Sequence, residues 1–283
     1  MNHAILLISC PDAKGITATV TNFIYQNQGN IIHADQHIDD QNNTFLMRIE
    51  WSLGGFRLEK GAIGKEFSKI AEQFQMNWEL SFTDDLPRVA IFVSKQLHCL
   101  HDLLFQYFYG QLRCKIPLVI SNHDDARLLV AGFKISFHHV HVTPENKKAQ
   151  ERREIELLKK EKIDLIVLAR YHQILSPEFV SEFPRRIINI HHSFLPAFAG
   201  KNPYQQAYQK GVKVIGATSH YVNDQLDEGP IIAQDTVQVS HRDTLEDFIR
   251  KGMDVEKAVL NRTVHLALQR KILSYGNKTV VFD

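Results

Sequence analysis

Apolar and polar residues alternate along residues 4–82 in a pattern that predicts short strands and two helices. Apolar positions three and four residues apart predict amphipathic helices, one ending near Gln28-Gly29 and one over residues 63–74. Apolar runs and period-two alternation predict strands over residues 4–8, 31–38, 44–51 and 78–82. The resulting order, βαββαβ, is the ferredoxin-like pattern.

From residue 89 onward, apolar runs typical of buried strands alternate with helical stretches. The predicted strands cover residues 89–93, 117–120, 163–169, 187–190, 212–222 and 231–239. The predicted helices cover residues 97–109, 124–131, 145–162 and 244–274. This alternation indicates an α/β domain with a Rossmann-like, mostly parallel, doubly wound sheet. The polar turn at residues 83–87 predicts a hinge, so we expect one domain over residues 1–84 and a second over residues 85–283.

Composition argues against several classes of function. The formal net charge is +1 and the charged runs mix signs, so we expect no nucleic-acid partner. No apolar run is long enough to span a membrane, and the N-terminus lacks the features of a signal peptide. The three cysteines are widely spaced, which argues against a disulfide framework and a zinc knuckle. We therefore expect a cytoplasmic protein.

Two short segments carry the candidate chemistry. Asn189 and His191 lie two residues apart at the end of an apolar strand, so their side chains point to the same side. Asp227 follows in a later Asp-Glu-Gly-Pro turn. An amide can donate to an oxyanion, an imidazole can move a proton, and a carboxylate can orient the imidazole. Together these residues suggest chemistry at a carbonyl carbon.

The Asn-x-His segment with its later Asp-x-Gly-Pro loop resembles the catalytic trio of the folate-dependent formyltransferase superfamily. The resemblance implies catalytic roles for Asn189, His191 and Asp227. It also implies that His220, on the strand before the Asp227 loop, lines the site.

Residues 168–177 resemble the loop with which that superfamily binds folate. There, backbone groups read the pteridine edge and apolar side chains cover the ring. The resemblance implies substrate contacts from Arg170, Tyr171, Gln173, Ile174 and Leu175.

The segment at residues 94–104, SKQLHCLHDLL, stands where a glycinamide ribonucleotide transformylase carries a glycine-rich phosphate loop. It contains no glycine, so backbone amides are poorly placed to surround a phosphate. It resembles instead the 10-formyltetrahydrofolate deformylases, which implies hydrolysis to tetrahydrofolate and formate, formate supply for purine synthesis, and no cofactor. Lys95, His98 and Cys99 would then line the acceptor side, the space that an amine acceptor occupies in the transferases.

The turn from Pro11 to Gly15 precedes the first helix and resembles the ligand turn of ACT domains. The resemblance implies pairing of such domains into a homo-oligomer, with an amino-acid effector held near Asp12 and Gly15. A purely structural pairing module is the alternative.

Three further alternatives stay open from the sequence. One is a formyltransferase that acts on an amine. Another is a metal hydrolase, because the chain has 15 histidines, although no HExxH motif is present and we expect no metal. The third is a catalytically inactive amino-acid sensor, against which the intact trio argues.

Overall fold

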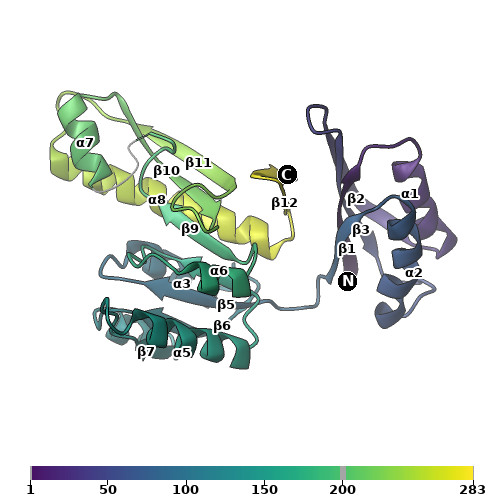
Figure 1. The fold of residues 1–283 in the computed structure, drawn as a ribbon, viewed down its shortest axis with the longest axis horizontal. Coiled ribbons are helices and arrows are strands. Elements are labelled where there is room, and N and C mark those ends of the chain that lie inside the picture. The colour runs from purple at the N-terminus through teal and green to yellow at the C-terminus, as the bar shows by residue number, and fades with distance from the viewer. Residues whose placement is uncertain (1, 198–201, 283) are drawn as a thin grey trace. The chain divides into compact units, whose positions relative to one another are not determined.

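A computed structural model describes residues 2–197 and 202–282 of the chain. The chain forms two compact units, the first containing Met1–Leu86 with Gln269–Asp283 and the second containing Pro87–Leu268. Figure 1 traces the elements of each unit by residue number. Within the described residues, no helix is both long and apolar enough to cross a membrane.

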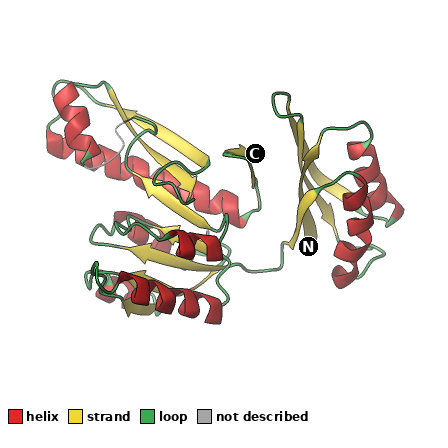
Figure 2. Cartoon of the chain, in the orientation of Figure 1, coloured by secondary structure: helices red, strands yellow, loops and turns green. Residues whose placement is uncertain are grey.

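The first unit is built on a four-stranded antiparallel sheet with the strand order β2-β3-β1-β4. Its elements are β1 (His3–Pro11), α1 (Ile16–Gln26), β2 (Asn30–Asp39), β3 (Thr44–Ser52), α2 (Lys60–Gln73) and β4 (Asn77–Phe82). Figure 2 shows both helices on one face of this sheet, where Trp51 and Phe67 are fully enclosed in the apolar core. The predicted βαββαβ order is confirmed.

A C-terminal hairpin completes the first unit. It consists of β12 (Ile272–Tyr275) and β13 (Lys278–Val281). Leu273 and Phe282 pack with Leu7 and Leu46 in one buried cluster. Because Leu6 and Ile8 on either side of Leu7 belong to the helix-facing core, this cluster lies on the other face of the sheet.

The hairpin corrects two expectations about the C-terminus. The sequence placed all of residues 85–283 in the second domain, whereas residues 269–283 belong to the first unit. The helical stretch predicted over 244–274 ends earlier, since α8 covers Leu245–Leu268 and Arg270 adopts a left-handed φ of 53°. Both errors arise because the apolar residues of the hairpin pack against strands near the start of the chain, which local periodicity cannot reveal.

The second unit contains a seven-stranded sheet with the order β11-β10-β9-β8-β5-β6-β7. Its strands are β5 (Arg88–Val93), β6 (Lys115–Ser121), β7 (Ser136–His139), β8 (Leu165–Leu168), β9 (Ile187–His191), β10 (Val214–Tyr221) and β11 (Ile231–Gln238). Its other helices are α3 (His98–Phe108), α4 (Arg127–Gly132), α5 (Lys147–Lys160), α6 (Pro177–Glu182) and α7 (Pro203–Lys210). The pairs within β5–β9 are parallel and β10 is antiparallel to both neighbours, which confirms a mostly parallel sheet.

The sheet order decides where a site can form. β5, β8 and β9 are parallel neighbours, so the loops that follow them leave from one edge of the sheet. Open α/β sheets bind ligands at such an edge. α8 packs against β10 and β11 and runs along the half of the unit that contains them (Figure 1).

Candidate active site

β9 and β10 place two polar side chains of the site directly opposite each other. Their antiparallel register pairs Asn189 with His220, and Asn189 Nδ2 lies 3.2 Å from His220 Nε2. His220 Nδ1 donates to the Tyr221 carbonyl oxygen at 2.9 Å. A neutral His220 therefore presents Nε2 as an acceptor, and the Asn189 amide donates to it.

The loop after β10 brings Asp227 back to these side chains. Asp227 Oδ2 lies 3.2 Å from His191 Nδ1, and Oδ1 lies 3.7 Å from His220 Nε2. Asp227 adopts a left-handed φ of 58°, a conformation in which Asp is more readily found than most residues. The structure thus brings together Asn189, His191, His220 and Asp227, as the sequence predicted.

Glycine at position 229 makes the loop geometry feasible. A Cβ built there would lie 1.7 Å from the Tyr221 carbonyl oxygen, so no side chain can be accommodated without moving the backbone. Tyr221 N donates to the Pro230 carbonyl oxygen at 2.9 Å, which ties the loop to the end of β10. The Asp-Glu-Gly-Pro motif therefore fixes Asp227 through its backbone.

The electrostatics of the site favour an ionised Asp227. Burial of the carboxylate opposes ionisation, but the two histidines beside it, His191 before His220, outweigh it and hold the pKa of Asp227 well below its ordinary value. With His191 Nδ1 engaged by the carboxylate, Nε2 is the remaining functional atom of that ring. It is buried and has no hydrogen-bond partner within the described residues. A buried polar atom without a partner calls for an explanation, and an open position for a bound ligand would supply one.

Thr218 is a residue that sequence reasoning missed. Its hydroxyl donates to the Ser193 carbonyl oxygen at 2.8 Å and accepts from Leu195 N at 3.0 Å and Gln234 Nε2 at 2.9 Å. Thr218 is the β10 partner of His191. It therefore anchors the segment that leaves the catalytic strand.

The predicted folate loop leaves the same edge of the sheet after β8. Arg170 begins it with a left-handed φ of 63°, and Ser94 Oγ accepts from His172 N at 3.0 Å. Ile174 is 58% exposed and Leu175 is half-buried, so both can cover a bound ring. Gln173 is also half-buried.

Two residues of this loop are engaged by the protein itself. Tyr171 is buried, and its ring meets Phe92 edge-on at 5.2 Å. The Arg170 guanidinium donates from Nε to Gln96 Oε1 at 2.9 Å, and Nε lies 3.3 Å from Glu256 Oε2. Both side chains therefore hold the loop in place, and the predicted substrate contacts of Arg170 and Tyr171 remain a prediction.

The acceptor side is closely packed. Cys99 is buried, and this burial, followed by the charge of Glu256, raises the pKa of the thiol well above its usual range, so it stays protonated and is a poor nucleophile. His98 Nε2 lies 2.8 Å from Glu256 Oε2. Lys95 is exposed in the preceding loop.

One group of potential metal ligands lies within the described residues, namely His98, Cys99 and Glu256. Arg170 Nε is 3.3 Å from the same carboxylate oxygen that His98 contacts. A cation placed there would meet a guanidinium, so this group fits an ion pair better than a metal site.

The predicted effector turn forms the start of α1. Gly15 is the N-cap residue with a left-handed φ of 94°, and Asp12 N donates to the Asn43 carbonyl oxygen at 2.9 Å. The first turn of α1 has no acidic side chain. The turn is compatible with an anionic ligand, which remains a prediction.

Comparison with known protein families covers both units. The model of the formyl transferase family matches residues 87–264, and that of the ACT domain matches residues 4–71. A formyltetrahydrofolate deformylase of Synechocystis sp. is 58% identical over 279 residues, covering 99% of this chain and 98% of its own length. The chain belongs to the formyltetrahydrofolate deformylase family.

Other members of the family agree over the full length. A Bacillus subtilis formyltetrahydrofolate deformylase is 48% identical, covering 98% of this chain and 93% of its own length. The crystal structure of a formyltetrahydrofolate deformylase from Pseudomonas syringae superposes with a TM-score of 0.98 at 44% identity, covering 100% of this chain and 95% of that one. A glycinamide ribonucleotide transformylase from Symbiobacterium toebii has a TM-score of 0.67 at 29% identity, covering 72% of this chain and 98% of that one. The transformylases thus share part of the fold, whereas the deformylases share all of it.

Proposed function

We propose that this chain hydrolyses 10-formyltetrahydrofolate to tetrahydrofolate and formate. The observation that carries the proposal is full-length similarity to formyltetrahydrofolate deformylases in a chain whose Asn189, His191 and Asp227 meet in one site. The formate would supply purine synthesis, and the reaction would balance the pools of one-carbon folates. Transfer to an amine acceptor is not favoured, because the deformylases and not the transformylases match both units.

In the proposed mechanism, His191 Nε2 takes a proton from water as the water oxygen attacks the formyl carbon. Asp227 accepts the Nδ1–H hydrogen bond, which fixes the tautomer and stabilises the imidazolium that forms. The Asn189 amide has two N–H groups, so it can donate to His220 and also to the developing oxyanion.

The second half of the reaction breaks the bond between the formyl carbon and N10. His191 Nε2 returns its proton to N10, which leaves as the amine of tetrahydrofolate. The remaining product is formic acid, which loses a proton to solvent and becomes formate. Water thus supplies the hydroxyl group of formic acid and the N10 proton, and no redox cofactor is needed.

We further propose that the backbone of residues 170–175 reads the pteridine edge while Ile174 and Leu175 cover the ring. The half-exposed apolar side chains in this loop support that assignment. A metal is not required in this mechanism. Formate release should therefore continue after dialysis against a strong chelator, and loss of activity that returns with a divalent metal would contradict it.

For the first unit we propose an amino-acid effector, such as glycine or methionine, bound between paired copies at Asp12 and Gly15. The match to ACT domains supports this assignment. We expect a homo-oligomer in solution, which light scattering coupled to gel filtration can test. If no amino acid changed the melting temperature or the rate of formate release, the effector proposal would be abandoned.

We place the reaction in the cytoplasm. Cys10, Cys99 and Cys114 are buried free thiols, which suits a reducing compartment.

The direct test of the proposed function is to incubate the chain with 10-formyltetrahydrofolate and no amine. We expect formate and tetrahydrofolate in equal amounts. Turnover that appears only after an amine is added would make the protein a transferase.

A further inference from the structure

Glu256 on α8 is a fully buried carboxylate that the proposed mechanism does not use. Its Oε2 lies 2.8 Å from His98 Nε2 and 3.3 Å from Arg170 Nε, and its Oε1 accepts a hydrogen bond from the Tyr204 hydroxyl. The side chains of Glu256, Arg170 and His98 are 1%, 6% and 8% exposed, respectively. These four residues form the Glu256 network.

The network ties α8 to three segments that are distant in sequence. His98 begins α3, directly after the loop that follows β5. Arg170 begins the predicted folate loop after β8, and Tyr204 lies in the first turn of α7. Burial opposes ionisation of Glu256, but His98 and Arg170 outweigh it and lower the pKa of the carboxyl, so the network is an ion pair with hydrogen bonds.

One side chain, His192, connects the network to the catalytic histidine, His191. The His192 ring lies 5.2 Å from the His191 ring and 5.9 Å from the Tyr204 ring, centroid to centroid. Tyr204 itself lies against Gly252 of α8, where any Cβ would be 2.2 Å from the phenol ring. A glycine at this position therefore lets Tyr204 reach Glu256.

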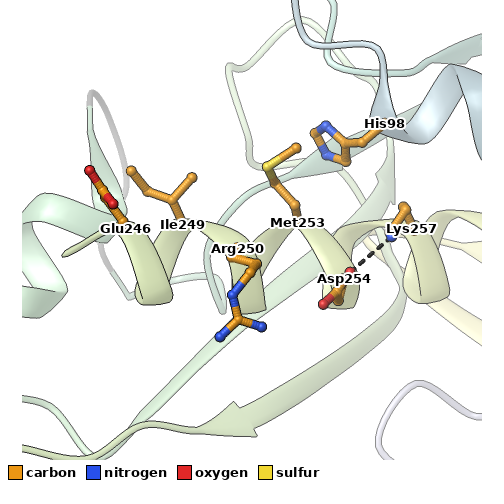
Figure 3. Close-up of a pocket in the computed structure, with 7 residues that line it drawn as sticks. All are labelled: His98, Glu246, Ile249, Arg250, Met253, Asp254 and Lys257. Atoms are coloured by element: carbon orange, nitrogen blue, oxygen red, sulfur yellow. Dashed lines mark ion pairs between the residues drawn. The ribbon is translucent and has the colours of Figure 1, made fainter. Parts of the chain in front are cut away.

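On the other side of His98 lies an open pocket of about 260 Å³ (Figure 3). Figure 3 shows His98 facing a row of α8 side chains that includes Met253 and Lys257. His98 lines this pocket while its Nε2 is bound to Glu256. The imidazole is therefore the wall between the pocket and the buried network.

We propose that the Glu256 network closes the acceptor side and thereby restricts the nucleophile to water, with His98 as the specificity-determining residue. This inference rests on the proposed hydrolysis. The proposal names the side chains that fill the space of an amine acceptor. The absence of a glycine-rich loop says only that a phosphate would bind poorly there.

The energetic reason is the cost of disturbing buried charges. An amine that entered past His98 would have to separate the imidazole from Glu256, which takes a hydrogen bond away from a buried carboxylate. A water molecule needs no such space. The network therefore discriminates by size, through a barrier that only larger nucleophiles meet.

The test compares the nucleophiles that the full-length chain uses. The protein is incubated with 10-formyltetrahydrofolate and glycinamide, and formate and N-formylglycinamide are quantified by mass spectrometry. Wild type should release formate alone at every glycinamide concentration. His98→Ala removes the imidazole that separates the pocket from the network. We expect the fraction of formyl groups transferred to the amine to rise at least about tenfold. His101→Ala, which removes an exposed histidine from the same helix, is the matched control and should behave as wild type.

A second variant guards against a folding defect. His98→Asn is smaller than wild type but keeps a polar side chain at this position, and it should also transfer formyl groups to glycinamide. Formate alone from both His98 variants would overturn the inference, as would transfer by wild type or by His101→Ala at the level of His98→Ala. Loss of all turnover in both His98 variants at unchanged melting temperatures would also overturn it, because His98 would then serve hydrolysis itself. Absence of formate release by wild type would instead refute the proposed function.

Discussion

At the scale of single residues, the account depends on the His191–Asp227 pair. His191→Ala removes the nitrogen that we propose takes the proton, and Asp227→Asn removes the carboxylate that accepts from Nδ1. We expect each change to lower kcat for formate release by about 100-fold or more, the scale of general acid–base catalysis. Asp224→Asn, at an exposed position in the same loop, is the control and should retain wild-type turnover. Near-normal rates in either catalytic variant would falsify the assigned pair.

Glu154 on α5 offers a prediction about pH. It is 2% exposed, Oε1 has no partner within the described residues, and burial followed by the charge of Glu151 raises its pKa from 4.5 to about 8. The unfolded chain therefore loses this proton at lower pH than the folded chain, so Glu154 destabilises the fold increasingly as pH rises from about 4.5 to about 8.

Replacing Glu154 by Gln removes this titration. The melting temperature of Glu154→Gln relative to wild type should rise between pH 5 and pH 8, by roughly 3 °C or more. Glu156→Gln, on the same helix, should show no such trend. A difference between Glu154→Gln and wild type that is constant across this range would contradict the buried, protonated state.

Some site residues could be predicted from the sequence and others could not. Asn189, His191 and Asp227 could be predicted because two short motifs contain them and strand geometry orients the first two. Glu256 could not, because helix periodicity says only that it lies on α8. Its burial depends on His98, Arg170 and Tyr204, which no local pattern associates with it.

At the scale of elements, the loop after β10 is the most constrained part of the site. Gly229→Ala would place a Cβ 1.7 Å from the Tyr221 carbonyl oxygen and must displace the backbone that holds Asp227. We expect a loss of at least about tenfold in kcat, because catalysis is sensitive to displacements of this size. Gly132→Ala is the control, since a Cβ there meets nothing within 4 Å. Unchanged turnover in Gly229→Ala would show that the loop tolerates the shift.

Most elements could be predicted from hydrophobic periodicity, because nearly all of them bury one face or both. The strands β5, β8 and β9 are almost continuous apolar runs, as expected for parallel strands covered on both sides. The helical stretch predicted over 244–274 includes the start of β12, because Ile272 and Leu273 continue the apolar spacing of α8. The left-handed Arg270 lies between α8 and β12, where the helix has ended.

At the scale of the whole molecule, the C-terminal hairpin makes the first unit discontinuous in sequence. Phe282 is 2% exposed and packs with Leu7 and Leu46. Phe282→Ala should destabilise this unit by about 3–5 kcal/mol, the usual cost of removing a buried aromatic ring. Chemical denaturation followed by circular dichroism measures the loss. Tyr25→Ala, which truncates an exposed ring of α1, should cost little, and equal effects would argue against the hairpin as part of the core.

The measurement that tests the central claim most directly is the origin of the oxygen atoms in formate. The protein is incubated with 10-formyltetrahydrofolate in water enriched in ¹⁸O, without an amine, and the formate is analysed by mass spectrometry. Attack of water activated by His191 predicts one solvent oxygen in each formate and an equal amount of tetrahydrofolate. Formate that carries no solvent oxygen, or no formate release at all, would contradict hydrolysis at this site.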